Sequence, residues 1–532
     1  MSFTLCEIIY SETSRRLKHA ARNITEAEAC GSEAMAVSIQ SDTQMASMNL
    51  GSLDLLVLAV YFAAILAVGL WFGRGERDTH DFFLGGGRQH WLVVGLSIIA
   101  TEVSALTFLI VPGRSYETNC WYLQMYAGAV VGRILIILLF LPAFYGGAVT
   151  TVYEYLGLRF GPWTRTTASL MFFASRIVGS GIRLLAASLA ISMVFGWRLE
   201  WVVIGLAGVA ILYTSFGGIK AIIWTDALQA LVFLGGGIAV AVYLFITIPG
   251  DWSANIAVAY DAGKLQTFNW SWDFNNVTAF WVLLIHATIQ NMAALGTDQD
   301  LTQRMLTCPD LRRGQRALLF NTLVGLPVVC LFLLVGALLF VFYQDHSPPG
   351  ELGAADRVFA HFIATDLPTG YGLKGLLVAG IFAAAMSSLD SALGALSSSA
   401  VTDFYRPYVK PLASEQHYLR AARTSTILFG LLLIGVALAF ADSKQLLEDA
   451  FGWVGLIFGG MLGVFLIGVT TKRRGGDRTN TAAMLSSVGV LAALKFYQER
   501  SGVLYVAWPW WVVIGTAWTY AGGIVFRTRR TR

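Results

Sequence analysis

Charge is scarce in this chain. Only 13% of its 532 residues are Asp, Glu, Lys or Arg, whereas a soluble protein carries about 25% of such residues. The net charge of +4 is too small, and its basic residues too scattered, to indicate a nucleic-acid-binding surface. Because 56% of the residues are hydrophobic, an ordinary soluble protein is excluded, and most of the chain is expected to lie in lipid.

Cysteine and histidine are sparse as well. The five cysteines are an odd number without a CxxC or a His-rich spacing, so neither a disulfide framework nor a transition-metal site is indicated, and we expect buried small side chains. No glycine loop for a nucleotide and no nucleophile beside a base is found. A membrane enzyme would need clustered histidines or paired carboxylates at an interface, so we do not expect an enzyme.

The first 50 residues lack a long apolar segment and the basic, apolar and small-residue pattern of a signal peptide. We expect residues 1–50 to form a disordered tail and residues 51–532 to form the membrane domain. Met45 and Met48 stand just before the first apolar run, so an over-extended start codon is an alternative.

Apolar runs of about 20 residues recur along the rest of the chain, and each is long enough to cross a hydrocarbon core of about 30 Å as a helix. The sequence therefore predicts an all-α polytopic membrane protein of about 13 transmembrane helices. The predicted spans are 53–73, 90–112, 121–147, 166–195, 199–216, 221–248, 276–296, 317–343, 372–401, 421–441, 446–470, 480–497 and 507–526.

Arg and Lys are concentrated in every second connection between the spans. Basic residues favour the cytoplasmic side of a membrane. If the Arg-rich end at 527–532 is cytoplasmic, the outer connections hold about one basic residue each. We therefore predict a plasma (inner) membrane protein with its N-terminus outside and its C-terminus inside.

The ninth span contains a face of small, oxygen-bearing residues. Ser387, Ser391, Gly394 and Ser398 share one side of a helix there. Hydroxyl, carbonyl and carboxylate oxygens are the ligands that a small hard cation accepts. Small residues also line ordinary helix–helix contacts in membranes, so the pattern alone leaves both interpretations open.

A few charged residues stand inside the spans, and each needs a partner, a cavity or a function, because a charge at the bilayer centre costs at least about 2.5 kcal/mol. In the second span, Glu102 lies in a stretch of small polar residues that interrupts an apolar helix. Irregular backbone at that depth is tolerated only in protein or beside a cavity. The charged residues are Glu102, Arg133, Arg176, Arg183, Asp226 and Asp390.

Three segments follow one another in a characteristic order: YTSFGGIKAIIWTDALQ at 213–229, GTDQDLTQR at 296–304 and AAAMSSLDS at 383–391. Together they resemble the motifs of the sodium:solute symporter family, and the likeness runs from about residue 53 to 470. The SALTFLIVPG run at 104–113 looks closer to the bacterial sialic acid and monocarboxylate branches than to the animal glucose carriers.

This resemblance implies a leucine-transporter-like inverted repeat of five plus five helices over about 88–470, with two extra helices at 480–526. The first helix of each repeat would be discontinuous near the bilayer midplane. The resemblance also implies a main sodium site made by Ala100, Val103, Ala384, Ser387 and Ser388. A second cation site would involve Asp226, Ser387, Asp390 and Ser391, where Asp390 replaces a serine of the family.

The substrate contacts implied by the resemblance are Glu102, Ser104, Thr107, Gln124, Arg176 and Arg183. An arginine would suit a carboxylate, so an organic acid, an acidic sugar or a sugar is expected. The expected function is sodium-coupled symport of a small solute by alternating access, with Na⁺ as coupling ion and no organic cofactor. Proton coupling, and a sensor or channel on this scaffold, remain alternatives. The expected partners are the substrate and the bilayer, without nucleic acid, and a monomer is the simplest assembly.

Overall fold

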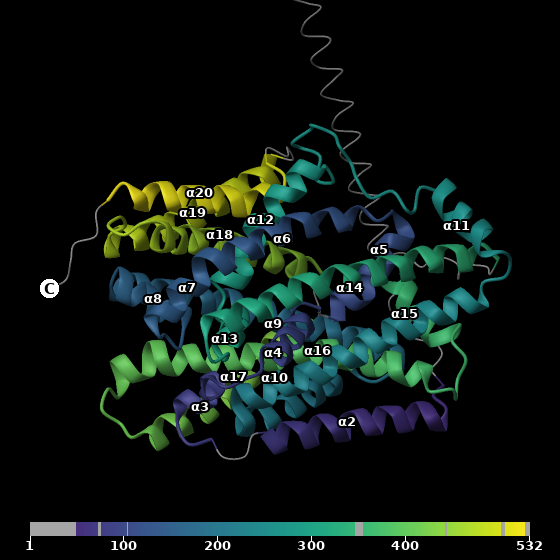
Figure 1. Ribbon diagram of the computed structural model, residues 1–532, viewed down its shortest axis with the longest axis horizontal. Coiled ribbons are helices and arrows are strands. Elements are labelled where there is room, and N and C mark those ends of the chain that lie inside the picture. Colours follow the sequence, from purple (N-terminus) through teal and green to yellow (C-terminus); the bar gives the residue numbers. More distant parts are fainter. Residues whose placement is uncertain are drawn as a thin grey trace, which may run out of the picture.

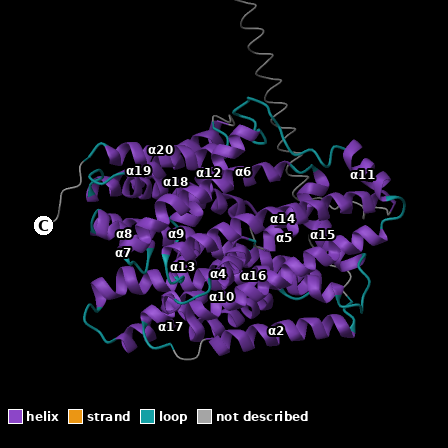
Figure 2. Cartoon of the chain, viewed as in Figure 1, coloured by secondary structure: helices purple, strands orange, loops and turns teal. Residues whose placement is uncertain are grey.

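The computed structural model describes residues 49–72, 76–103, 105–345, 355–441, 444–501 and 506–526, and their regular structure is helical (Figure 2). The predicted tail lies almost entirely outside the described residues. The longer helices are α2 (Ser52–Phe72), α4 (Trp91–Glu102), α5 (Ala105–Glu117), α6 (Gln124–Leu135), α9 (Pro162–Phe195), α10 (Leu199–Thr247), α12 (Phe280–Gly296), α14 (Leu311–Asp345), α16 (Leu373–Ser399), α17 (Glu415–Ala439), α18 (Lys444–Thr470), α19 (Asp477–Ser501) and α20 (Pro509–Ile524).

Shorter helices connect or extend these. They are α3 (Thr79–Leu84), α7 (Leu141–Gly147), α8 (Val152–Arg159), α11 (Trp252–Asp261), α13 (Gln299–Leu306), α15 (Ala355–Thr365), the 3₁₀ turns η1 (Gly85–Gly87) and η2 (Trp121–Leu123), and the π-helical segments η3 (Ile136–Phe140) and η4 (Ala400–Val409).

Each predicted span coincides with a helix, and two of them fall inside the 49-residue α10. In the described residues, seven helices are long and apolar enough to cross a membrane, or up to nine if each of two bent helix pairs is one span. The chain is therefore an all-helical polytopic membrane protein, and the count of thirteen spans stays a prediction.

Local signals in the sequence account for several helix ends. The side chains of Thr151, Asp298 and Ser414 each accept a hydrogen bond from a backbone N–H in the first turn of α8, α13 and α17. Such caps satisfy N–H groups that have no partner within the helix. Gly196 ends α9 in the left-handed region, with φ of 66°.

Gly218 divides α10 where two spans were predicted. Its φ of 51° and ψ of −152° break the helix, and a Cβ there would lie 2.5 Å from the carbonyl oxygen of Phe82 in α3. Only glycine combines this backbone conformation with so close an approach. The glycine pair of the 213–229 segment thus joins two helices and holds α3 against the joint.

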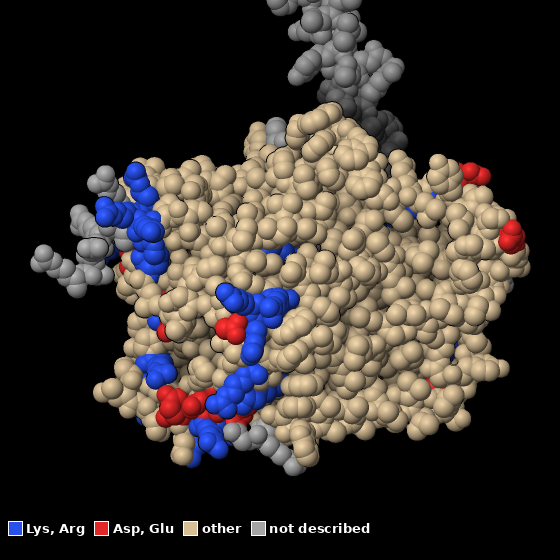
Figure 3. Space-filling model, viewed as in Figure 1, with Lys and Arg blue, Asp and Glu red and all other residues tan. Residues whose placement is uncertain are grey.

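The helices run roughly along the long axis of the molecule (Figure 1). Helices α18, α19 and α20 lie along one edge and α2 lies along the other, with α16 between them. The C-terminus and the loops near α3 lie towards one end, and α11 and α15 lie at the other. Lys and Arg side chains on the visible face gather towards the C-terminal end, and the rest of that face is largely uncharged (Figure 3).

Helix α16 forms the centre of the fold. Every residue from Leu377 to Ser399 is buried, including its six serines and Asp390. Because lipid never reaches this helix, its hydroxyl groups must find partners in protein or in a bound solute.

The cysteines follow the prediction in part. Cys120 and Cys308 are buried, whereas Cys330 is exposed on α14, and Cys6 and Cys30 lie outside the described residues. The expected burial was therefore wrong for Cys330, because the outer side of a membrane helix packs against lipid rather than against protein.

Candidate transport site

Two broken helices meet α16 in the middle of the fold. The first break follows α4: Val103 has an extended backbone with ψ of 94°, and α5 begins at Ala105. The second break separates α12 from α13, which are bent by 63° to each other. A helix end leaves carbonyl groups without intrahelical partners, so both breaks expose backbone oxygen at this depth.

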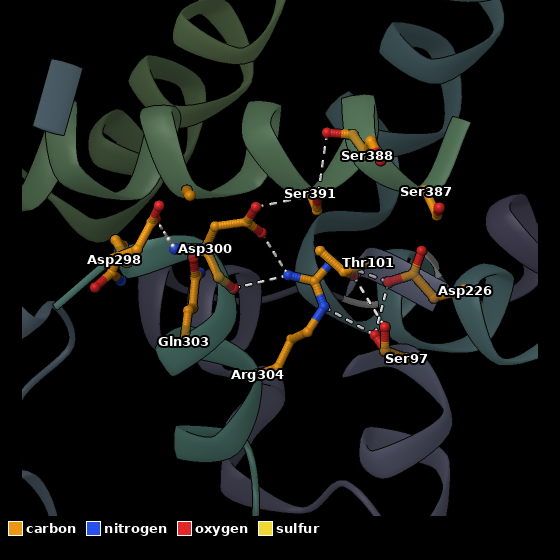
Figure 4. Close-up of polar contacts among 12 residues, drawn as sticks. Ser97, Thr101, Asp226, Asp298, Asp300, Gln303, Arg304, Ser387, Ser388 and Ser391 are labelled. Atoms are coloured by element: carbon orange, nitrogen blue, oxygen red, sulfur yellow. Dashed lines mark hydrogen bonds and ion pairs between the residues drawn. The ribbon is translucent and has the colours of Figure 1, made fainter. Parts of the chain in front are cut away.

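One hydrogen bond joins the two helices that carry the predicted main cation site. The Ser387 hydroxyl donates to the Ala100 carbonyl at 2.9 Å and lies 3.3 Å from the Ala384 carbonyl. The Ser388 hydroxyl lies 3.3 Å from the same Ala384 oxygen. Val103 stands three residues after Ala100, at the end of the break, and is 8% exposed. The structure thus brings the α4 break and the predicted face of α16 together (Figure 4).

An arginine that the sequence interpretation assigned only to a connection holds the neighbouring polar cluster together. Arg304 of α13 is 1% exposed and donates to Asp226 at 2.9 Å and to Asp300 at 2.7 Å. Its Nε also donates to the Ser97 hydroxyl, which in turn donates to Asp226 at 2.6 Å. The Ser391 hydroxyl reaches Asp300 at 3.3 Å, so α16 is tied to the same network (Figure 4).

These contacts correct the pairing considered for Asp226. The sequence alone favours a pair with Lys220, because the two residues are six positions apart. Lys220 instead lies 3.4 Å from Glu76 and 3.7 Å from Asp81. Asp226 turns inward to Arg304 because a buried carboxylate needs a buried cation.

Asp390 lacks a cationic partner. One of its oxygens accepts a hydrogen bond from the Tyr213 hydroxyl, and the other has no hydrogen-bond partner. No ion pair to Asp390 is found among the described residues, and the nearby Arg304 pairs with Asp226 and Asp300 instead. Asp226 also has one oxygen without a partner, and the like charges of the two carboxylates repel each other.

The charges around α16 are therefore unequal. The four carboxylates of this region, Asp226, Asp298, Asp300 and Asp390, face only three guanidinium groups, Arg176, Arg183 and Arg304. One negative charge is left over. A buried surplus charge is costly unless a cation or a proton neutralises it.

A cavity of about 380 Å³ opens beside the first break. On one wall Glu102 and Arg133 form an ion pair at 2.9 Å, to which Asn321 adds a hydrogen bond at 3.0 Å. Arg133, one of the charges within the spans that needed a partner, thus has one in Glu102. Glu102 does not neutralise an arginine of the fourth span, since both of its oxygens accept hydrogen bonds from Arg133.

The two arginines of the fourth span differ sharply. Arg176 is paired with Asp298 and lies 3.0 Å from Asp300. Arg183 lines the same cavity, but it has neither an ion pair nor a hydrogen bond among the described residues. Arg183 is therefore a guanidinium that faces the cavity with its donors unused.

The remaining predicted substrate residues are only partly brought together. Thr107 lines the cavity with Glu102. Gln124 does not: it is fully buried elsewhere, where it donates to the Thr278 carbonyl and accepts from the Asn269 N–H. Ser104 lies outside the described residues. Tyr122, Met125, Tyr126 and Phe332 line the cavity although the sequence interpretation did not select them.

One contact that the sequence interpretation missed could have been predicted from a local pattern. Asp300 and Arg304 are four residues apart in GTDQDLTQR, the spacing of a helical ion pair, so their contact could have been expected. The link from Arg304 to Asp226 joins residues 78 positions apart and no local pattern indicates it. His286, a single histidine in the apolar helix α12, contacts the Pro509 carbonyl at 2.9 Å.

Two broken helices around a polar cavity in a lipid-embedded bundle define a membrane transporter rather than an enzyme. A family model described as the sodium:solute symporter family matches residues 82–488. The chain belongs to the sodium:solute symporter family and is thus a sodium-coupled solute symporter.

Individual relatives agree with this assignment. The chain is 29% identical over 453 residues to the sodium/sialic acid symporter SiaT of Proteus mirabilis, which covers 84% of this chain and 90% of the relative. It is 29% identical to the human sodium-coupled monocarboxylate transporter 1 over 78% of this chain and 69% of the relative. A solved structure of a Na⁺-coupled sialic acid symporter, substrate-bound and outward-open, superimposes with a TM-score of 0.82 at 26% identity, covering 90% of this chain and 98% of that one.

Proposed function

We propose that this protein couples sodium entry to the uptake of a small organic acid, an acidic sugar or a monocarboxylate, across the plasma (inner) membrane. The observation that carries the proposal is Arg183, a guanidinium on the cavity wall that makes no ion pair and no hydrogen bond among the described residues. The sialic acid and monocarboxylate substrates named for the relatives each bear a carboxylate. A guanidinium is the side chain best suited to bind a carboxylate through two parallel hydrogen bonds.

The cavity also fits this substrate class. Its volume of about 380 Å³ exceeds what a two- or three-carbon acid fills and accommodates a monosaccharide-sized molecule. Thr107 and Asn291 offer hydroxyl and amide groups for a polyol chain, and Phe332 offers an apolar face. Arg176 is assigned a structural role, because Asp298 and Asp300 already occupy its donors.

The main sodium site is proposed at Ala100, Val103, Ala384, Ser387 and Ser388. Three carbonyls and two hydroxyls are neutral hard oxygen ligands, which suit a monovalent ion that must leave again. The contacts of 2.9 and 3.3 Å among these oxygens support the proposal. A sodium ion would replace the Ser387 hydrogen bond as the link between α4 and α16.

A second cation is proposed near Asp226, Ser387, Asp390 and Ser391. The surplus negative charge of this region supports it, as do the two carboxylate oxygens without partners on Asp226 and Asp390. Asp226 would contribute only the oxygen that Arg304 and Ser97 leave free. Whether sodium or a proton neutralises the surplus charge is an outcome of the experiment below.

The proposed cycle follows from these positions in an inverted-repeat core over residues 88–470, with the N-terminus outside. Sodium stabilises the outward-open bundle by bridging α4 and α16, which raises the population of the state that binds substrate. One charge crossing 100 mV supplies about 2.3 kcal/mol, and a tenfold sodium gradient supplies about 1.4 kcal/mol more. Together these concentrate a substrate several hundred-fold.

The test is uptake into proteoliposomes of labelled sialic acids, monocarboxylates, neutral sugars and amino acids, under an inward sodium gradient. Sodium-dependent accumulation of an acid, lost in the Ser388→Ala variant, is expected. Accumulation of a neutral sugar alone would refute the carboxylate assignment. Accumulation that follows a proton gradient and ignores sodium would refute the cation assignment.

A further inference from the structure

A second groove lies on the lipid-facing surface, away from the transport cavity. It runs between the π-helical segment η3 and the first turns of α14. Gln315 of α14 donates to the Ile137 carbonyl at 2.9 Å and joins the two walls. The groove encloses about 380 Å³, enough for a lipid headgroup and the start of an acyl chain.

Two arginines stand at one end of this groove. Arg312 and Arg316 are both exposed, and because they are four residues apart they share one side of α14. Asp310, the nearest acid in the sequence, does not pair with them: it lies 3.4 Å from Arg313 and accepts a hydrogen bond from the Arg313 backbone N–H. Among the described residues neither groove arginine has an ion pair, and no acidic side chain lines the groove.

The rest of the groove is apolar and exposed. Ile134, Leu138 and Leu319 line it and are 45%, 61% and 47% exposed. Leu319 lies about one turn beyond Arg316 along α14, towards the middle of this 35-residue helix. The groove therefore presents two positive charges at the end where α14 begins, and aliphatic side chains towards the middle of that helix.

We infer that this groove is a binding site for an anionic phospholipid. The headgroup phosphate contacts Arg312 and Arg316, and an acyl chain lies against Ile134, Leu138 and Leu319. A free phosphate would use only the arginines, whereas the exposed aliphatic side chains match the chain of a lipid. Basic pockets between membrane helices are known to take such headgroups. The site does not depend on the proposed substrate or coupling ion.

The experiment is native mass spectrometry of the purified full-length protein with phosphatidylglycerol and phosphatidylcholine of identical acyl chains. Because each basic residue at a membrane surface contributes about 1 kcal/mol, the preference for phosphatidylglycerol is expected to be roughly 30-fold. Arg312→Gln and Arg316→Gln should each lower this preference about fivefold. Arg313→Gln, the neighbouring arginine outside the groove, removes the same charge and should leave the preference unchanged.

A second pair of variants tests the apolar half. Leu319→Trp should fill the groove and reduce binding of both lipids, whereas Leu323→Trp, on an exposed position of α14 outside the groove, should not. Equal binding of the two lipids by the wild type would overturn the inference. So would an equal effect of Arg313→Gln and Arg312→Gln, or lipid binding that Leu319→Trp leaves intact.

Discussion

The two arginines of α9 offer a sharp test, because they lie seven residues apart on one helix and contribute to the same cavity. Within the described part of the chain Arg183 makes no hydrogen bond, whereas Arg176 pairs with two buried carboxylates. If Arg183 binds the substrate carboxylate, Arg183→Gln removes a charge-assisted hydrogen-bonded pair. Removing one partner of such a pair costs about 2–5 kcal/mol, so KM should rise roughly 30-fold or more.

The same substitution should leave folding intact. Because Arg183 makes no ion pair or hydrogen bond among the described residues, Arg183→Gln breaks no direct contact and should change Tm little. Arg176→Gln should act in the opposite way, because it leaves Asp298 and Asp300 facing each other without that cation. Breaking a buried ion pair costs about 3–5 kcal/mol, which predicts poor expression or a Tm lowered by several degrees.

The assays are uptake kinetics in proteoliposomes and thermal unfolding of the same purified samples. An uncharged amide analogue of the substrate provides the control. Arg183→Gln should weaken recognition of the acid and leave recognition of the amide largely unchanged. If Arg183→Gln lowers Tm as much as Arg176→Gln while KM stays constant, Arg183 is a structural residue and the substrate assignment fails.

Three further predictions concern other parts of the fold. Ser387→Ala should raise the sodium concentration for half-maximal uptake by about 10- to 150-fold, with substrate KM little changed at saturating sodium, since one contact to a charged group is worth about 1.5–3 kcal/mol. An unchanged sodium dependence would contradict the site. Gly218→Ala should lower Tm by an amount equivalent to about 1–3 kcal/mol, because it combines a positive φ with a close contact to Phe82, and an unaltered Tm would show that the joint can relax. Burial raises the pKa of Glu76, in the loop after α2, to about 7, so its contribution to stability is present at low pH and is lost as the pH rises from about 4.5 through 7. Glu76→Gln should therefore match the wild type in Tm at pH 5 and exceed it at pH 8. Equal Tm values of the two proteins at both pH values would refute the raised pKa.

Much of the architecture could be predicted from local patterns. Apolar runs set the positions of the helices, and the glycine pair at 217–218 marked the joint inside α10. The serine face of α16 was readable because a helix brings every third or fourth residue to one side. Ala100 and Ala384 could be assigned to the sodium site only through the family resemblance, because a ligand that is a backbone carbonyl leaves no signature in the sequence.

The polar pairings could not be predicted. Glu102 had Arg133, Arg176 and Arg183 as equally plausible partners, and only the packing of α6 against the α4 break selects Arg133. Gln124 stood at a plausible substrate position, but the outer segment near 269 and 278 satisfies its amide. Charge compensation in a membrane protein is decided between helices, where sequence distance carries no information.

The geometry would also link the proposed cation and substrate sites. Ala100 belongs to the proposed cation site, and Glu102, two residues later in the same last turn of α4, forms the cavity wall with Arg133. Asp300 makes a second link, because it lines the cavity, binds Arg304 and contacts Ser391 of α16. A cation that draws α4 towards α16 would therefore fix the cavity wall that Glu102 and Arg133 form. Through Ser391 and Asp300 it would also act on the wall that carries Asp300. Linkage is reciprocal: if bound sodium raises the affinity for a substrate carboxylate at Arg183 by some factor, bound substrate must raise the affinity for sodium by the same factor. If sodium affinity measured with and without bound substrate were identical, these two links would carry no coupling.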